Sequence, residues 1–122
     1  MVNFADIERE FEGPDIEGLK LDTQRIIAQI RAVPYGQVAS YKEVGNLAGL
    51  VNGARQVARI LHSLSDKYQL PWWRIIKSDG TMGLTGAARA EQIRLLRLEG
   101  LEVSDIGRVS QKKRKVTNEN RS

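Results

Sequence analysis

Two adjacent tryptophans, Trp72 and Trp73, carry the most distinctive chemistry in this sequence of 122 residues. They lie in the run PWWRII, which occupies positions 71–76. An indole ring stacks on a purine and packs against an alkyl group, but it provides no nucleophile. Two such rings can also simply fill the core of a small protein. The run therefore predicts either a pocket wall for a flat ligand or ordinary core packing.

The rest of the sequence offers little to an enzyme. It contains no cysteine, which excludes thiolate nucleophiles and zinc-thiolate sites. His62 is the only histidine, and we expect it at the surface or facing a ligand rather than in a catalytic role. The sequence has no metal-ligand cluster and no phosphate-binding glycine loop. We therefore expect no catalytic residue, no metal and no other cofactor.

The charges are segregated along the chain, although the formal net charge is only +4. Residues 1–22 hold seven acids and two bases, residues 23–104 eleven bases and six acids, and residues 105–122 six bases and two acids. A basic body and a basic tail favour a nucleic-acid partner, although a solvated surface can sort its charges in the same way. The run Lys112–Lys115 fits phosphate binding, nuclear localisation or a solubilising tail.

Apolar spacing predicts four helices in the body of the protein. The first starts at Thr23 and ends before Pro34, and the last spans about 87–98 with Gly100 after it. The second helix begins after Ser40, whose side chain can form a capping box with Glu43. The residues expected to face inward recur at helical spacing; they are Ile26, Ile27, Ile30, Val33, Val44, Leu47, Ala48, Ala90, Ile93 and Leu96.

A further helix, from Ala54 to Leu64, has an apolar face formed by Ala54, Val57, Ala58, Leu61 and Leu64. Since a short glycine-containing turn separates it from the helix after Ser40, the two form a helix-turn-helix. Residues 65–69 are expected to be a polar loop, and 70–76 an extended segment. A turn at 78–80 would let Thr81 and Met82 pair back on that segment as a short β-hairpin.

The ends of the chain differ from the body. Phe4, Ile7 and Phe11 suggest a short amphipathic helix in the acidic arm, either packed on the core or acting as a lid. Residues 105–122 lack apolar spacing and are expected to be disordered. No apolar run approaches the roughly 18 to 20 residues of a membrane span, and the N-terminus lacks signal-peptide regions. We therefore expect an intracellular protein with no membrane contact.

Five sequence blocks together resemble the DNA-binding domain of O6-alkylguanine-DNA alkyltransferases in order and spacing. The resemblance covers roughly 22–103. That family has Pro-Cys-His-Arg-Val where this sequence has a Trp in place of the Cys, as in alkyltransferase-like proteins, which bind the damaged base without repairing it. The blocks are Val33-Pro34-Tyr35-Gly36, Ser40-Tyr41-Lys42-Glu43, Ala54-Arg55, Pro71 to Ile76 and Leu98-Glu99-Gly100.

The resemblance implies a mainly α, winged-helix-like single domain of the alkyltransferase C-terminal type, with a helix-turn-helix and a short β-hairpin. An acidic arm (1–22) would precede the DNA-binding domain (23–104), and a disordered basic tail (105–122) would follow it. Arg55 would fill the gap left by a flipped base, and Tyr41 would rotate its phosphate. The DNA-binding residues implied are Tyr41, Ala54, Arg55, Gln56, Ala58 and Arg59.

The same resemblance implies a lesion pocket, with Trp72 in the place of the nucleophile and the amide of Ile75 offered to the base. Arg74 would anchor the motif. In the alkyltransferases a histidine, a water and a glutamate activate the thiolate; Glu99 is the only member of this relay present here, and it would hold the fold by hydrogen bonding. Gly86 replaces a serine donor. The pocket residues implied are Tyr41, Trp72, Trp73, Ile75, Met82, Gly83 and Thr85.

These features predict a monomeric, non-enzymatic sensor of DNA damage. Its partner would be double-stranded DNA containing O6-alkylguanine, bound through the minor groove with the base flipped out and no alkyl transfer. The family resemblance implies hand-over to nucleotide excision repair proteins. The expected location is the cytoplasm, associated with the nucleoid, in a bacterium, or the nucleus in a eukaryote. The alternatives are a helix-turn-helix regulator of an undamaged site and an enzyme with an unconventional nucleophile.

Overall fold

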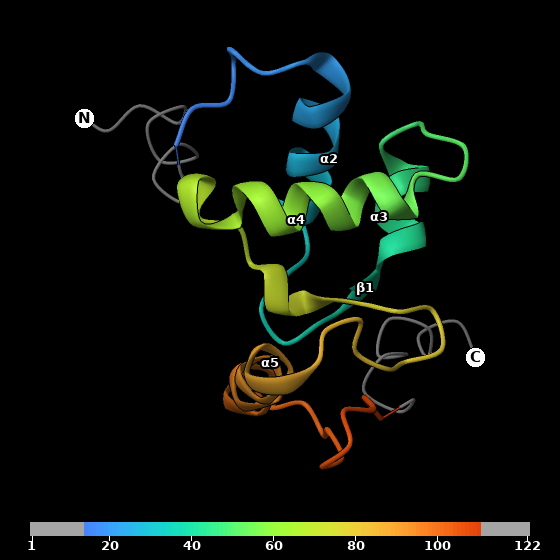
Figure 1. Cartoon of the computed structure of the whole chain (residues 1–122), viewed down its shortest axis with the longest axis vertical. Helices are drawn as coiled ribbons and strands as arrows, with labels where there is room; N and C mark the ends of the chain where they lie inside the picture. Colours follow the sequence, from blue (N-terminus) through green and yellow to red (C-terminus); the bar gives the residue numbers. More distant parts are fainter. Residues whose placement is uncertain (1–13, 111–122) are drawn as a thin grey trace.

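The computed structural model describes residues 14–110, and the expected N-terminal helix and the run Lys112–Lys115 lie outside these described residues. The described part is mainly α-helical, as the sequence predicts (Figure 1). Its elements in chain order are α2 (Leu21–Arg31), β1 (Ala39–Ser40), α3 (Tyr41–Leu47), α4 (Ala54–Tyr68), the 3-10 turn η1 (Trp72–Arg74), β2 (Ile75–Ile76) and α5 (Gly86–Leu98).

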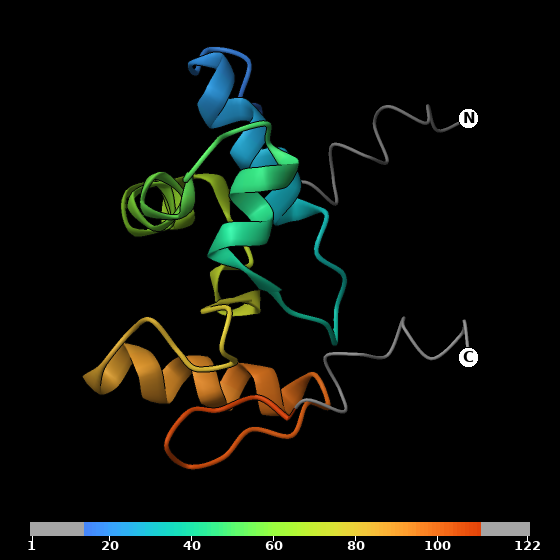
Figure 2. The ribbon, with the colours of Figure 1, turned by 90° about the vertical axis from the view of Figure 1, so that its right-hand side faces the viewer.

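The helices form two layers, with α2, α3 and α4 together at one end and α5 at the other (Figures 1 and 2). The first three helices enclose an apolar cluster, which we call the upper core. Residues 101–110 fold back beside α5 and close a second cluster, the lower core. The upper core consists of Ile26, Ile27, Ile30, Val33, Val44, Ala48, Val57, Ile60, Tyr68, Leu70 and Ile75. The lower core consists of Ile76, Met82, Ile93, Leu96, Leu101, Val103 and Val109.

A two-residue strand joins the layers. Because successive side chains of a strand point to opposite sides, Ile75 enters the upper core while Ile76 enters the lower core. The predicted hairpin is wrong in its pairing, because β2 runs parallel to β1, with Ala39 opposite Ile75. The turn after β2 does form: the Lys77 amide donates to the Thr81 carbonyl at 2.8 Å. Thr81 then bridges residue 108 instead of extending back along β2.

The helix-turn-helix forms as predicted, from α3 and α4. Ser40 and Glu43 make both hydrogen bonds of the capping box, at 2.9 and 2.8 Å. Two glycines allow the elements to approach closely. A Cβ added to Gly45 would lie 3.1 Å from the carbonyl carbon of Gly53, so a side chain there would push the turn away from α3. The close approach sets the direction in which α4 leaves the turn.

Three details of the helices differ from the prediction. Leu47 is 68% exposed rather than core-facing. The helix α4 continues through the predicted loop to Tyr68, whose side chain is buried, and ends at Gln69 with φ of 55°. In α5, Ala90 is exposed rather than core-facing. Gln92 is fully buried instead, and its side-chain amide donates to the backbone carbonyls of residues 73 and 75.

The packed body is longer at both ends than the predicted range 23–104. Ile16 and Leu19 pack against the upper core. At the other end, the Val109 amide donates to the Gly80 carbonyl at 2.9 Å, and the Val109 side chain is only 2% exposed. Residues 105–110 are therefore part of the fold and not of a disordered tail. Within the range 14–110, no helix is long and apolar enough to cross a membrane.

Candidate nucleic-acid interface

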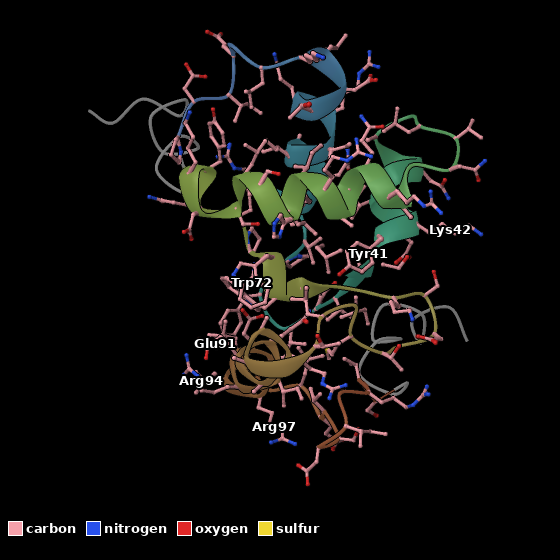
Figure 3. All side chains as sticks on the ribbon, viewed as in Figure 1. Tyr41, Lys42, Trp72, Glu91, Arg94 and Arg97 are labelled. Atoms are coloured by element: carbon pink, nitrogen blue, oxygen red, sulfur yellow. The ribbon has the colours of Figure 1, made fainter. Side chains whose placement is uncertain are left out.

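A cavity of about 540 Å³ lies between the two layers. One side is a face of α4, another is η1, and the remainder comes from α3, the segment after β2 and the start of α5. Figure 3 shows the Tyr41 side chain from α3 and the Trp72 side chain from η1 in the space between α4 and α5. The lining residues are Tyr41, Ala58, Leu61, His62, Ser65, Trp72, Lys77, Gly83, Leu84 and Ala88.

The two tryptophans occupy different environments. Trp72 lines the cavity, whereas Trp73 packs against the lower core. Their rings meet edge to face, with centroids 5.9 Å apart and an interplanar angle of 88°. The tight backbone of η1 forces this divergence, since the Arg74 amide donates to the Pro71 carbonyl at 3.1 Å. Trp72 is thus the tryptophan whose indole can meet a ligand in the cavity.

Behind the cavity, the Glu99 carboxylate accepts hydrogen bonds from four donors, and these bonds hold η1 in place. Its carboxylate accepts from the Trp73 Nε1 at 2.7 Å, from the Gly36 amide at 2.7 Å, and from both Nε and Nη2 of Arg74. The Arg74 Nη1 also donates to the Val33 carbonyl at 3.0 Å. Arg74 and Glu99 therefore hold the motif from behind, the structural role that the sequence assigned to them.

The protonation of Glu99 follows from these contacts. Desolvation by burial raises its pKa, but the hydrogen bonds from Arg74, Gly36 and Trp73 and the charge of Arg74 outweigh that effect. The net result is a lowered pKa, so Glu99 remains a carboxylate at neutral pH. The Glu99 side chain is 6% exposed and that of Arg74 is 15% exposed, so the pair is largely shielded from water.

Tyr41 lies at the edge of the cavity over a glycine. A Cβ added to Gly83 would lie 2.7 Å from the Tyr41 hydroxyl oxygen and 3.1 Å from its ring, so a side chain at 83 would displace the phenol. Desolvation by burial raises the pKa of Tyr41 above its usual value, which keeps the hydroxyl protonated and able to donate. Tyr41 thus presents a hydrogen-bond donor at the rim of the cavity.

The predicted DNA-contacting residues of α4 begin at its N-terminus. Arg55 and Arg59 are exposed, and Ala54 and Gln56 are partly buried. Ala58 is exposed and also lines the cavity. Since residues three apart on a helix are neighbours on one face, Arg55 lies about one turn, or about 5 Å, from the cavity wall. The structure therefore places an exposed arginine one helical turn from a residue that lines the cavity.

Four of the predicted pocket residues do not line the cavity. Trp73 is bonded to Glu99, and Met82 is buried in the lower core. Thr85 is exposed at the start of α5. Ile75 is buried in the upper core, and its amide donates to the Trp72 carbonyl, so the expected offer of this amide to a base is wrong for this arrangement.

The cavity also contains residues that the sequence reasoning did not assign to it. Of these, Leu61, His62 and Ser65 lie on α4 in the same stripe as Ala58, at spacings of three, four and seven residues. That spacing was a usable signal, but reading residues 65–69 as a loop obscured it. Leu84 lies in the loop 82–86, which the family resemblance assigns to a wall of the pocket, and it does line the cavity. The sequence carries no comparable signal for Lys77 and Ala88, since their place depends on how distant segments fold together.

The lining residues carry groups that can stack on a ligand or form hydrogen bonds with it. The cavity wall offers an indole, a phenol, a histidine, a hydroxyl and an ammonium group. The hydroxyl, that of Ser65, already donates to the Leu61 carbonyl at 2.6 Å. Within residues 14–110 there is no group of histidine, cysteine, aspartate or glutamate side chains that could hold a metal ion.

Comparisons with known proteins agree on one family. The family described as "6-O-methylguanine DNA methyltransferase, DNA binding domain" matches residues 22–101. The DNA base-flipping protein of Vibrio parahaemolyticus is 38% identical over 91 residues, 75% of this chain and 91% of that protein. Alkyltransferase-like protein 1 of Schizosaccharomyces pombe is 36% identical over 73 residues, 58% of this chain and 68% of that protein.

A solved structure of S. pombe Atl1, in complex with damaged DNA containing O6-carboxymethylguanine, has the same fold. The TM-score is 0.59 at 27% sequence identity, and the match covers 80% of this chain and 91% of Atl1. A second Atl1 complex with DNA matches with a TM-score of 0.60. This chain therefore belongs to the alkyltransferase-like proteins, which are built on the DNA-binding domain of 6-O-methylguanine DNA methyltransferases.

Proposed function

We propose that this protein is a non-enzymatic sensor of O6-alkylguanine in duplex DNA. It approaches the minor groove with α4, flips the damaged nucleotide into the cavity beside Trp72 and holds it there without removing the alkyl group. Relatives named DNA base-flipping protein, and the complex of Atl1 with damaged DNA, support this proposal.

One observation carries it: an exposed arginine and an indole-walled cavity lie on the same face of the protein. Arg55 is about one helical turn from Ala58, which lines the cavity together with Trp72. A flat guanidinium can occupy the space of an extruded base and donate to the orphaned partner base. Trp72 can then stack on the extruded purine. Both halves of a base-flipping device are within reach of a single nucleotide.

The energetics require both halves. Extruding a base costs a few kcal/mol in lost stacking and pairing, least for a damaged base that pairs poorly. Insertion of Arg55 recovers part of that cost inside the duplex, and stacking on Trp72 recovers part of it in the cavity. A damaged guanine would therefore be held in preference to a normal one.

The residues at the centre of the site support the absence of alkyl transfer in this proposal. The sequence has no cysteine, and Trp72 stands where the resembling alkyltransferases have one. The Trp73 Nε1 is engaged with Glu99, and an indole nitrogen cannot accept a proton from a nucleophile. No group in the described part of the cavity is an activated nucleophile of the kind that covalent catalysis uses.

Two measurements on one pair of duplexes test this proposal. Fluorescence anisotropy would compare the affinity for a duplex with a central O6-methylguanine and for the same duplex with guanine, and we expect tighter binding to the former. Incubation with a duplex labelled in the methyl group should leave all label in the DNA. Equal affinity for the two duplexes, or label transferred to the protein, would refute the proposal.

The helix-turn-helix formed by α3 and α4 favours one rival, a regulator that binds an undamaged sequence. Selection from a pool of random undamaged duplexes distinguishes the two functions. A regulator would enrich one sequence strongly, whereas a lesion sensor would enrich none and would prefer an O6-alkylguanine in any context.

A sensor that holds a lesion without repairing it needs a second system to complete the work. We include in the proposal that a bound monomer hands the lesion to nucleotide excision repair, acting at the nucleoid in a bacterium or in the nucleus of a eukaryote. Deleting the gene in a host with intact excision repair should raise its sensitivity to O6-alkylating agents. Deleting it in an excision-deficient host should add nothing, and additive sensitivity would contradict the hand-over.

A further inference from the structure

We infer that the cavity selects O6-alkyl groups that end in a negative charge, and that Lys77 is the residue that determines this selectivity. The inference rests on the proposed function and adds to it a chemical class of lesion. Among the residues that line the cavity in the described part of the chain, Lys77 is the only lysine or arginine, and the lining includes no carboxylate.

The backbone polar groups of Lys77 are already hydrogen-bonded, which leaves its side chain to interact with a ligand. The Lys77 amide donates to the Thr81 carbonyl at 2.8 Å, and its carbonyl accepts from the Gly80 amide at 2.9 Å, so the turn holds this backbone in place. Residues 14–110 include no ion pair to the Lys77 ammonium group. The Lys77 ammonium group, carried by a residue whose backbone is held in the turn, is therefore available to a ligand in the cavity.

The nearby acids are engaged elsewhere. Asp79, in the same turn, accepts hydrogen bonds from the Thr81 hydroxyl and amide at 2.6 and 3.0 Å, which lower its pKa more than the charge of Lys77 does. Glu91, one turn beyond the lining part of α5, is held by two hydrogen bonds from Arg94 (Figure 3). On the opposite wall α4 adds His62. Asp79 keeps its negative charge and interacts with Lys77 through the turn, but no carboxylate lines the cavity, so the charge that faces a ligand there is that of Lys77.

The test uses two lesions of nearly equal shape in the same duplex. O6-carboxymethylguanine ends in a carboxylate, and O6-carbamoylmethylguanine ends in a neutral amide. The protein variants are Lys77→Met, which removes the charge, and Lys77→Glu, which reverses it. The matched control is Lys67→Met, since Lys67 is a surface lysine near the end of α4 that does not line the cavity. Thermal unfolding would verify that each variant folds.

We expect the unaltered protein to bind the carboxylate lesion about two- to fivefold more tightly than the amide, as for a partly solvated ion pair. Lys77→Met should abolish the difference, Lys77→Glu should invert it, and Lys67→Met should retain it. The preference should also shrink as salt is raised. Equal affinity for the two lesions in the unaltered protein, or a preference that survives Lys77→Met, would overturn the inference while leaving lesion binding intact. Failure to prefer either lesion over guanine would overturn the proposed function together with this inference.

Discussion

The indole nitrogen of Trp73 donates to the Oε2 of Glu99 at 2.7 Å. In the alkyltransferases that this chain resembles, a histidine at this position and a glutamate belong to the relay that activates the thiolate. Here the position still reaches Glu99, but the indole only donates, so the geometry of the relay persists without its proton acceptor. This relationship makes a gain of activity testable.

Trp72→Cys alone should not restore efficient alkyl transfer. A free thiol with a pKa of about 8.5 is only a few per cent thiolate at neutral pH, and Trp73 cannot take its proton. The double change Trp72→Cys with Trp73→His supplies nucleophile and base beside Glu99, and it should react at least about tenfold faster. The measurement is single-turnover transfer of a labelled methyl group from O6-methylguanine duplex. Rapid transfer by the single variant would show that the site needs only a nucleophile.

Arg55→Ala should weaken binding to O6-methylguanine duplex by about 1 to 3 kcal/mol, because the inserted side chain offsets much of the unstacking cost. Arg25→Ala is a matched control, since Arg25 is exposed on α2, away from the cavity. Anisotropy titrations of both variants measure the effect. If Arg55→Ala and Arg25→Ala show the same small loss of affinity for the O6-methylguanine duplex, Arg55 does not enter the duplex.

Tyr41→Phe should weaken lesion binding while preserving the fold. Tyr41 packs against the upper core, so the larger change Tyr41→Ala would also destabilise α3. The phenylalanine keeps the ring over Gly83 and removes only the hydroxyl donor, whose loss costs about 0.5 to 1.5 kcal/mol for a neutral hydrogen bond. Affinity equal to that of the unaltered protein would mean that the hydroxyl does not contact DNA.

Removing residues 111–122 should lower the salt dependence of DNA binding more than the preference for the lesion, since phosphate contacts carry no information about the base. This segment holds five bases and one acid. Each lost phosphate contact should reduce the slope of log affinity against log salt by about 0.9. An unchanged slope would show that the tail does not touch DNA.

A longer deletion should behave differently. Ending the chain after Ser104 also removes Val109 from the lower core, which should cost about 2 kcal/mol of folding free energy. Denaturant titration of the two truncated proteins separates the effects. Equal stability would contradict the packing of residues 105–110.

Glu99→Gln should destabilise the protein at neutral pH by about 3 kcal/mol, because it leaves the buried Arg74 without its charge partner. Since the folded-state pKa of Glu99 is lowered, its stabilising contribution is complete above the unfolded value of about 4.3 and is lost as pH falls through the folded value. The difference in the free energy of unfolding between the unaltered protein and Glu99→Gln should therefore become smaller as the pH falls from 7 to 3. Glu91→Gln is the control, since its exposed partner Arg94 contributes little. A difference that stays constant with pH would contradict the ionic role of Glu99.

The helix-turn-helix could be predicted because its signals are local. Ser40 and Glu43 are three residues apart, and Gly49 takes the left-handed conformation that ends a helix, with φ of 86°. The pairing of Ala39 with Ile75 could not be predicted, because neither two-residue strand carries information about its distant partner. The run PWWRII alone gave no means of deciding which indole faces the cavity, since that depends on Glu99 capturing Trp73.

Polarity misled the prediction where tertiary contacts override it. Residues 65–69 look like a loop, yet Tyr68 is buried and draws the helix one turn further. Glutamine is rarely a core residue, yet Gln92 is fully buried and its side-chain amide donates to the backbone carbonyls of residues 73 and 75. Lys77 reaches the cavity wall only because the turn after β2 closes on Thr81.

The perpendicular indoles give this protein a built-in optical reporter. Trp72 and Trp73 are its only tryptophans, and only the first lines the cavity. A purine stacked on Trp72 should quench the emission of that ring, while Trp73, tied to Glu99 in the lower layer, should emit unchanged. Intrinsic fluorescence can therefore time the arrival of an extruded base separately from the initial encounter with DNA, in unlabelled protein and without a modified nucleotide analogue.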